Sequence, residues 1–259
     1  MKAIIPVAGH GTRLEPHTLT HQKCLLPVAG KPVLEHILNR IVAAGITEVT
    51  LIIGHLGEQV IDFCSAYPHA QFTFVEQKEQ LGLGHAIYLG LKETKEPVLI
   101  VLGDSILELN YPEFISGSLS QLGVKKVPDP QRFGIVELEG DRVIKVVEKP
   151  EFPPTDLALI GIYYINNQLE LKDGIQNLID NDRRTKNEYQ LTDALQIMMD
   201  RGHVFTPFEI EACLDCGVPE TMLATNKILL KRVGESSIHI SAKVSNSNLV
   251  KSTVSKDCT

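Results

Sequence analysis

The chain has 259 residues, of which 43% are hydrophobic, and a formal net charge of -7 at pH 7. This length suits one large α/β domain or two small ones, and the hydrophobic content is enough for a sizeable core. The acidic balance and the scattered Lys and Arg argue against a nucleic-acid partner. No apolar run is long enough to span a bilayer and no secretory signal opens the chain, so we expect a cytoplasmic protein without a membrane partner.

Strands and helices are predicted to alternate in the first half of the chain. The patterns predict strands over residues 2–7, 47–53, 71–75 and 97–102, and helices over 32–44, 58–66 and 84–92. Such alternation builds a mostly parallel, mixed sheet with helices on both faces, so we expect a Rossmann-like α/β fold. Alternating strands then predominate from Phe133 onward, with a hairpin around Gly140 and Asp141.

The loop after the first predicted strand has a pattern suited to phosphate binding. Residues 6–14 read Pro-Val-Ala-Gly-His-Gly-Thr-Arg-Leu, and Gly9 and Gly11 let backbone N–H groups turn toward a triphosphate. Arg13 and Lys23 would add positive charge where a pentavalent phosphorus needs it. The loop lacks the third glycine of a dinucleotide fingerprint and the Gly-Lys-Ser/Thr of a P-loop. These features predict phosphoryl chemistry.

Asp104 follows the predicted strand that ends at Leu102. Since ligands bind at the carboxyl ends of strands in such sheets, Asp104 should lie on the same edge as the glycine loop. A carboxylate there could hold Mg²⁺ against triphosphate oxygens. An Asp that merely caps a helix or ends a turn would look the same in isolation.

Two further segments carry candidate binding residues. Gly82 and Gly84 would let a nucleobase lie against the backbone, while Gln77 could hydrogen bond to its edge; a plain helix-start turn is the alternative. Glu148 and Lys149 end the second strand of the hairpin and could bind sugar hydroxyls and a phosphate, respectively. Solvated surface charges are the alternative there.

The cysteines predict no metal or redox site. An odd number of thiols, five in all, without an export signal fits reduced cysteines. Cys213 and Cys216 form a C-x-x-C, but no second ligand pair at zinc spacing accompanies them. We expect them to be small buried residues flanking Asp215.

The ordered motifs resemble the signature of the sugar nucleotidyltransferases, the nucleoside-diphosphate-sugar pyrophosphorylases. That signature runs glycine-x-glycine-threonine-arginine-leucine, then proline, lysine, leucine-proline and lysine-proline. Its counterparts in this chain are Gly9-His10-Gly11-Thr12-Arg13-Leu14, Pro16, Lys23, Leu26-Pro27 and Lys31-Pro32. The resemblance extends to about Lys231 and implies a catalytic domain of the nucleotide-diphospho-sugar transferase type over residues 1–235.

The resemblance implies a role for each matching residue. The Leu-Gly-Asp triplet and the later Leu214–Glu220 segment supply the Mg²⁺ ligands, Asp104 and Asp215. The implied nucleotide-binding residues are Ala8, Gly9, Gly11, Thr12, Arg13, Gln77, Gly82 and Gly84. The implied sugar-phosphate-binding residues are Gly134, Glu148, Lys149, Gly161, Tyr163 and Lys186. The implied catalytic residues are Arg13, Lys23, Asp104 and Lys149.

One of these positions departs from the family pattern. The family often has arginine where this chain has Lys186, which keeps the charge but loses the bidentate geometry.

The implied reaction joins a nucleoside triphosphate to a sugar 1-phosphate. A sugar phosphate oxygen attacks the α-phosphorus in line and pyrophosphate leaves, without a covalent enzyme intermediate. The resemblance favours glucose-1-phosphate nucleotidylyltransferases that use dTTP or UTP. Ala8 and Gly84-His85-Ala86 are more typical of the uridylyltransferases, whereas the length and the tail resemble the thymidylyltransferase branch, which we favour.

Other activities remain as hypotheses. A cytidylyltransferase or phosphocholine-type enzyme would share the loop and the metal ligands, but Glu148 and Lys149 favour a sugar phosphate. A non-catalytic regulatory or nucleotide-sugar-binding module on the same fold would have lost catalytic groups. The candidate catalytic and metal-binding residues Arg13, Lys23, Asp104 and Asp215 are all present.

The C-terminal residues 236–259 carry a six-residue period. Two sets recur at this spacing, namely Ile238, Val244 and Val250, and Ala242, Asn248 and Val254. The period resembles the start of a left-handed β-helix of hexapeptide repeats; an irregular polar tail is the alternative. So short an array cannot bury itself, so we expect a truncated form of a longer protein whose missing repeats serve homo-oligomer assembly, regulation or a second activity.

Overall fold

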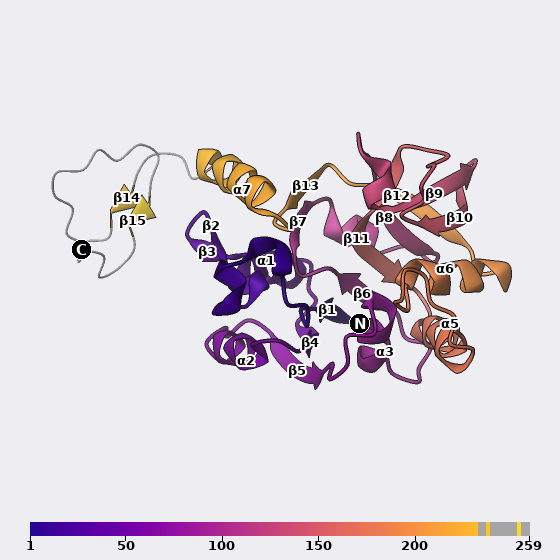
Figure 1. The fold of residues 1–259 in the computed structure, drawn as a ribbon, viewed down its shortest axis with the longest axis horizontal. Coiled ribbons are helices and arrows are strands. Elements are labelled where there is room, and N and C mark those ends of the chain that lie inside the picture. The colour runs from indigo at the N-terminus through magenta and orange to yellow at the C-terminus, as the bar shows by residue number, and fades with distance from the viewer. Residues whose placement is uncertain (233–236, 239–252, 255–259) are drawn as a thin grey trace.

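The computed structural model describes residues 1–232, 237–238 and 253–254. Its largest sheet has nine strands in the order β5-β4-β1-β6-β11-β8-β12-β10-β9 (Figure 1). These strands are β1 (Lys2–Pro6), β4 (Glu48–Ile53), β5 (Gln71–Glu76), β6 (Val98–Val101), β8 (Ser120–Lys126), β9 (Gly134–Glu139), β10 (Arg142–Glu148), β11 (Leu157–Ile165) and β12 (Phe205–Glu209).

Short strands and helices complete the fold. Smaller sheets pair β2 (Pro27–Val28) with β3 (Lys31–Pro32) and β7 (Ser105–Glu108) with β13 (Ala212–Asp215). The α-helices are α1 (Val33–Ala43), α2 (Gly57–Ser65), α3 (Leu83–Gly90), α4 (Tyr111–Phe114), α5 (Gln168–Asp180), α6 (Leu191–Asp200) and α7 (Pro219–Arg232). The 3-10 helices are η1 (Thr12–Leu14), η2 (His17–Leu19), η3 (Lys23–Leu25) and η4 (Pro130–Arg132).

Strand direction divides the large sheet into two halves. The strands β5, β4, β1 and β6 run parallel, which confirms the arrangement predicted from the alternating elements. In the other half only β8 and β12 pair in parallel, and β11 is antiparallel to both β6 and β8. The predicted hairpin is also confirmed: β9 and β10 are antiparallel and joined at Gly140, whose φ of 57° suits a tight turn.

Helices cover both faces of the sheet, as predicted. Consecutive strand residues point to opposite faces, so Ile5 and Leu51 enter one core while Ile4 and Ile52 enter the other. The first core includes buried residues of α1 and α2, and the second includes those of α3, α5 and α6. The two cores hold the strand ends, and therefore the loops that follow them, in fixed relative positions.

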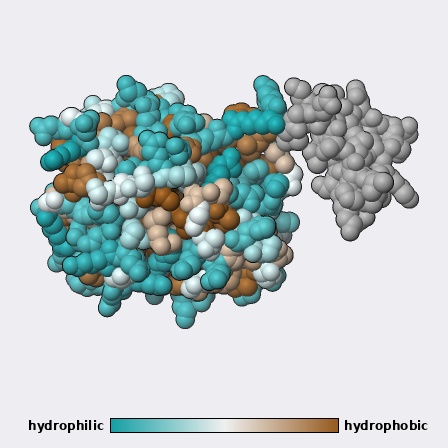
Figure 2. Space-filling model, turned by 180° about the vertical axis from the view of Figure 1, so that it is seen from behind, coloured by the Kyte–Doolittle hydropathy of each residue, from teal (hydrophilic) through white to brown (hydrophobic). Residues whose placement is uncertain are grey.

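The described surface is mainly polar, with hydrophobic side chains gathered in small patches on the face shown in Figure 2. Phe152 and Leu223 are the most exposed large hydrophobic residues, at 84% and 69%. Among the described residues, none of the helices has the length and apolar character needed to cross a membrane.

The C-terminal region is described only at two short strands. β14 (Ser237–Ile238) and β15 (Thr253–Val254) pair in parallel, as strands of successive β-helix coils would. The repeat positions Ala242, Val244, Asn248 and Val250 lie outside the described residues. The β-helix therefore stays a prediction.

Candidate active site

A cavity of about 280 Å³ lies at the carboxyl ends of β1, β5 and β6. Its lining comes from five parts of the chain: residues 6–9, residues 22–24, the residues Gln77, Gln80, Gly82, Leu83 and Ala86, residues 102–104, and Glu188. Ligands bind at this edge in open α/β sheets. The glycine loop and Asp104 thus share one site, as predicted from the order of the strands.

Side chains from three other segments hold the glycine loop in shape. Thr18 Oγ1 donates to the Gly11 carbonyl at 2.9 Å, Gln80 Nε2 donates to the Ala8 carbonyl at 3.3 Å, and Gln22 donates to the carbonyl of Val7. Because these bonds use carbonyl groups, they leave the N–H groups of the loop for an anion.

Glycine occupies two positions of this loop for different structural reasons. Gly11 has a φ of 68°, and a Cβ atom there would lie 2.9 Å from Thr18 Cγ2, so the backbone requires glycine. A Cβ atom at Gly9 would meet nothing within 4 Å, and Gly9 lines the cavity. Its bare backbone is therefore open to the cavity.

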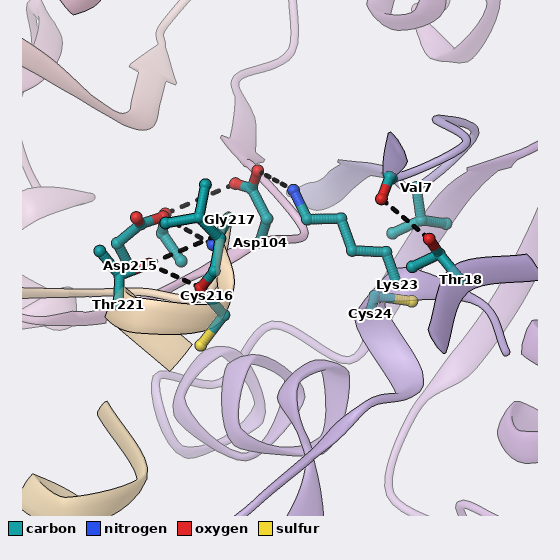
Figure 3. A network of polar contacts seen from close by, with 12 residues as sticks. Val7, Thr18, Lys23, Cys24, Asp104, Asp215, Cys216, Gly217 and Thr221 are labelled. Atoms are coloured by element: carbon teal, nitrogen blue, oxygen red, sulfur yellow. Dashed lines mark hydrogen bonds and ion pairs between the residues drawn. The ribbon is translucent and has the colours of Figure 1, made fainter. Parts of the chain in front are cut away.

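Lys23 and Asp104 form an ion pair within the cavity (Figure 3). Lys23 Nζ lies 2.6 Å from Asp104 Oδ2, and the two side chains are 15% and 31% exposed. Lys23 starts η3, and Asp104 stands between β6 and β7. The partial burial of both groups reduces screening by water, so their charges act strongly on a ligand in the cavity.

Pairing of β7 with β13 brings Asp215 beside Asp104. Asp215 lies opposite Ser105 in the ladder, and the N–H of Cys216 donates to the Asp104 carbonyl at 2.9 Å. Asp215 Oδ1 accepts a 2.9 Å hydrogen bond from the N–H of Gly217, which orients the carboxylate (Figure 3). The two predicted metal ligands are therefore neighbours: Asp215 ends β13, and Asp104 directly precedes β7, the strand with which β13 pairs.

This donor set fits Mg²⁺, which is commonly held through one or two carboxylates, several waters and substrate phosphate oxygens. In the described part of the chain, His, Cys, Asp and Glu nowhere form a group of three or more that could hold a metal by itself. Burial also raises the pKa of the Cys213 and Cys216 thiols, which disfavours the thiolates that zinc would need.

Arg13 reaches the same region near Gly217, two residues after Asp215. Its side chain is exposed, and a Cβ atom built on Gly217 would lie 3.5 Å from Arg13 Nη2. The structure thus brings Arg13, Lys23, Asp104 and Asp215 to one edge of the sheet. Thr12 is exposed in the first turn of η1 and does not line the cavity.

The predicted nucleobase loop reaches the cavity through Gln77 and Gly82. Gln77 is 4% exposed, and its Nε2 donates to the Gly82 carbonyl at 3.2 Å. Gly84 instead packs against the segment before α6: its N–H donates to the Tyr189 carbonyl at 2.8 Å, and a Cβ atom would lie 2.7 Å from that oxygen. Gly84 is outside the cavity lining, so its contact with a base stays a prediction.

The predicted sugar-phosphate residues cluster around Glu148, at the end of β10. The Glu148 side chain is 9% exposed, and its oxygens contact Lys149 Nζ and Thr192 Oγ1, each at 3.1 Å. A Cβ atom at Gly134 would lie 2.8 Å from Thr192 Cγ2, so glycine makes room for this contact. Lys186 Nζ donates to the Lys149 carbonyl at 3.1 Å, which brings the two predicted phosphate-binding lysines together.

Gly161 and Tyr163 lie deeper, within β11. Gly161 has a φ of 76°, and its carbonyl accepts a 2.8 Å hydrogen bond from the N–H of Leu102. Tyr163 is 4% exposed and belongs to the second core. Burial, with a smaller contribution from the charge of Glu148, raises the pKa of Tyr163. The structure gives both residues packing roles, and their sugar contacts stay predictions.

Gln22, Gln80 and Glu188 line the cavity but are absent from the residues predicted to bind substrate. Gln22 is 2% exposed despite its polar side chain, and Gln80 belongs to the base loop. In the sequence, only the nearby motif residues indicate these two glutamines: Lys23 follows Gln22, and Gln77 lies three residues before Gln80. Glu188 stands within the segment predicted to bind the sugar phosphate, but no pattern indicated that it faces this cavity.

Comparison with known proteins identifies the family. Residues 2–232 match the family model described as nucleotidyl transferase. The chain belongs to this family. Its relatives include sugar nucleotidyltransferases, the group whose signature its motifs resemble. The family assignment agrees with the phosphate loop and acidic residues at the carboxyl edge of the sheet.

Three curated relatives show the range of names within the family. The chain is 33% identical over 247 residues to the low-salt glycan biosynthesis nucleotidyltransferase Agl11 of Haloferax volcanii, covering 89% of this chain and 66% of the relative. It is 34% identical over 242 residues to the bifunctional protein GlmU of Methanococcus vannielii, covering 90% and 56%. For the glucose-1-phosphate thymidylyltransferase of Streptomyces antibioticus, the identity is 32% over 246 residues, covering 89% and 67%.

The fold also matches a solved structure. A UDP-glucose pyrophosphorylase complexed with UDP-glucose superposes with a TM-score of 0.78 at 24% identity, covering 89% of this chain and 98% of that chain. At this identity the match supports the fold alone. The chain spans between 56% and 67% of the length of the three curated relatives above.

Proposed function

We propose that this protein is a glucose-1-phosphate nucleotidyltransferase that condenses dTTP or UTP with glucose 1-phosphate, and that dTTP is the preferred donor. An oxygen of the sugar phosphate forms a bond to the α-phosphorus, the bond from that phosphorus to the bridging oxygen breaks, and pyrophosphate leaves. The observation that carries the proposal is the convergence of Arg13, Lys23, Asp104 and Asp215 at the cavity edge.

Each of these residues has a distinct role in the proposal. The N–H groups of the glycine loop and the Arg13 guanidinium bind the phosphates that leave. Lys23 neutralises charge at the transferred phosphoryl group, and Lys149 holds the attacking phosphate. Asp104 and Asp215 hold Mg²⁺, which supplies charge neutralisation for the leaving pyrophosphate. The protein therefore acts through positioning and electrostatics, without a nucleophilic side chain.

The preference for dTTP rests on the relatives and on the sequence pattern. Relatives named glucose-1-phosphate thymidylyltransferase share 31% to 32% identity with the chain. UTP is the second candidate, because Ala8 and the Gly84-His85-Ala86 run are typical of uridylyltransferases. The bases differ by one methyl group, which is worth about 1–3 kcal/mol in a pocket, so a single contact can reverse the preference.

Pyrophosphate release tests the proposal. The protein is incubated with Mg²⁺ and glucose 1-phosphate, in parallel with dTTP, UTP, CTP, ATP or GTP. Release with dTTP at the highest kcat/KM supports the full proposal, and a higher value with UTP supports the second candidate. The D104A variant serves as the control for contaminating activity. If no nucleotide gives pyrophosphate release while dTTP still binds, the result would contradict the enzymatic proposal and favour a binding module.

A further inference from the structure

Glu188 is a carboxylate on the lining of the nucleotide cavity to which nothing described so far gives a chemical role. It lies in the segment between α5 and α6. This segment and the first turn of α6 contact the predicted sugar-phosphate residues: Lys186 Nζ donates to the Lys149 carbonyl, and Thr192 Oγ1, in α6, donates to Glu148. Glu188 is therefore placed between the nucleotide cavity and the sugar-phosphate side.

The backbone holds Glu188 firmly in this place. Thr185 and Glu188 exchange two backbone hydrogen bonds, of 3.0 and 3.2 Å, across a tight turn. The central residues of the turn, Lys186 and Asn187, have φ values of 55° and 65°, which give the geometry of a type I′ turn. On the other side, a Cβ atom at Gly82 would lie 2.7 Å from Glu188 Cβ. Glycine at position 82 is thus what allows Glu188 to sit beside the nucleobase loop.

The charge of Glu188 limits what it can bind. The other carboxylate on the lining, Asp104, is paired with Lys23. Across the residues that the structure describes, Glu188 has no Lys, Arg or His within ion-pair distance, and Gln190 Nε2 donates to its Oε2 at 3.1 Å. An unneutralised carboxylate repels phosphates, and it can only accept hydrogen bonds. It therefore suits a neutral donor that belongs to the same ligand as the phosphates.

We propose that Glu188 is a specificity-determining residue that accepts a hydrogen bond from a substrate sugar hydroxyl. The hydroxyl is that of the nucleotide ribose or that of the sugar 1-phosphate, because both sugars flank the reacting phosphates. The inference rests on the proposed function and deepens it. It also bears on the choice of nucleotide, since UTP and dTTP differ at the ribose 2′-hydroxyl as well as at the base.

Matched substrate pairs that differ by one hydroxyl test this inference. For the wild type, E188Q and E188A, kcat/KM is measured with UTP against dUTP, and with glucose 1-phosphate against its 2-, 3-, 4- and 6-deoxy analogues. Charge-assisted hydrogen bonds discriminate by about tenfold or more. We expect the wild type to prefer the hydroxyl-bearing member of one pair by that factor, and E188A to bring the ratio within about threefold of one, with E188Q between them. The affected pair identifies which sugar Glu188 contacts.

The ratio within each pair separates hydrogen bonding from structural damage, because a distorted site lowers both members alike. E58Q is the matched control: Glu58 is an exposed acid in α2 and outside the cavity lining, so every ratio should stay at the wild-type value. An equal decrease of kcat/KM for both members of every pair in E188A, with all ratios unchanged, would overturn the inference. So would a change confined to UTP against CTP, which would assign Glu188 to the base.

Equilibrium binding keeps the test independent of turnover. Titration calorimetry compares UDP-glucose with UDP, and UDP with dUDP, for the wild type and E188A. Loss of the preference for UDP-glucose or for UDP in E188A supports the inference even if the wild type releases no pyrophosphate, in which case only the proposed activity fails. Equal preferences in both proteins reject the role of Glu188 and leave the proposed activity standing.

Discussion

Lys23 Nζ lies 2.6 Å from Asp104 Oδ2 although the two residues stand 81 positions apart in the chain. The contact ties the phosphate side of the cavity to the carboxylates predicted to hold Mg²⁺. An ammonium and a divalent cation that share one carboxylate repel each other at short range. The charges of Lys23 and Asp104 should therefore be tested together with metal dependence.

Replacement of Asp104 by Asn should remove metal-dependent turnover and leave the fold intact. Loss of one electrostatic partner of this kind lowers kcat by about 100-fold or more. Steady-state kinetics across a Mg²⁺ series measures the effect, and thermal unfolding checks the fold. Asp62, in the helix α2 and not on the cavity lining, provides the control D62N, which should keep wild-type kinetics. Full activity in D104N would contradict the two-carboxylate metal site.

Replacement of Lys149 by Ala should raise the KM for the sugar 1-phosphate more than the KM for the nucleotide. The lysine follows β10 directly after Glu148, and loss of a charge-assisted contact to phosphate costs about tenfold or more. Initial rates with each substrate varied in turn give the two values. Lys145 on the same strand pairs with Glu137 at 2.9 Å, so K145A is a matched control without an expected effect. Equal changes in both KM values would refute the assignment.

The glycines at positions 84 and 9 should respond differently to alanine. In G84A the new Cβ would meet the Tyr189 carbonyl oxygen at 2.7 Å, so we expect a loss of about 1–3 kcal/mol in the free energy of unfolding. In G9A the methyl group has open space, so stability should stay unchanged while nucleotide affinity falls. Urea denaturation and nucleotide titration measure the two effects. A stable G84A protein would mean that the α3 and 185–190 segments separate easily.

Lys2 should make the stability depend on pH in the alkaline range. Burial lowers its pKa from 10.5 to about 8, while Nζ donates to the Gly90 carbonyl at 2.6 Å. At pH values between these two pKa values, Lys2 is more protonated in the unfolded chain than in the folded one. The free energy of unfolding therefore increases as pH rises through this range. The difference between wild type and K2M, from urea denaturation, should increase from about pH 8 to about pH 10.5. A flat difference would argue against the shift.

Much of the fold follows from local patterns in the sequence. The buried runs at Ala3–Ile5 and Leu99–Val101, with amphipathic segments between them, predict the parallel half of the sheet. The order of the other half was not predictable, because β8 lies between β11 and β12 through contacts between residues distant in the chain. Such pairings depend on which strand edges and buried faces are available as the sheet assembles, and the sequence of a single segment does not contain that information.

The candidate site divides in the same way. Arg13, Lys23 and Asp104 follow from motifs, because phosphate and metal chemistry restrict the residue types and their order. Glu188 reaches the cavity only because Gly82 has no side chain and the 185–188 turn points it there. Tyr163 matched a family position, yet it is buried in the second core. Contacts between loops, and the depth of a side chain, emerge only once the sheet is assembled.

The pairing of β13 with β7 has a consequence for the order in which a newly synthesised chain gains its site. The glycine loop and Asp104 emerge from the ribosome early, whereas Asp215 follows much later and must then add its strand to β7. A nascent chain that has not yet formed this pairing holds only one of the two carboxylates. On the proposed function, a metal–nucleotide complex held by both carboxylates would favour the folded chain in which this pairing is complete.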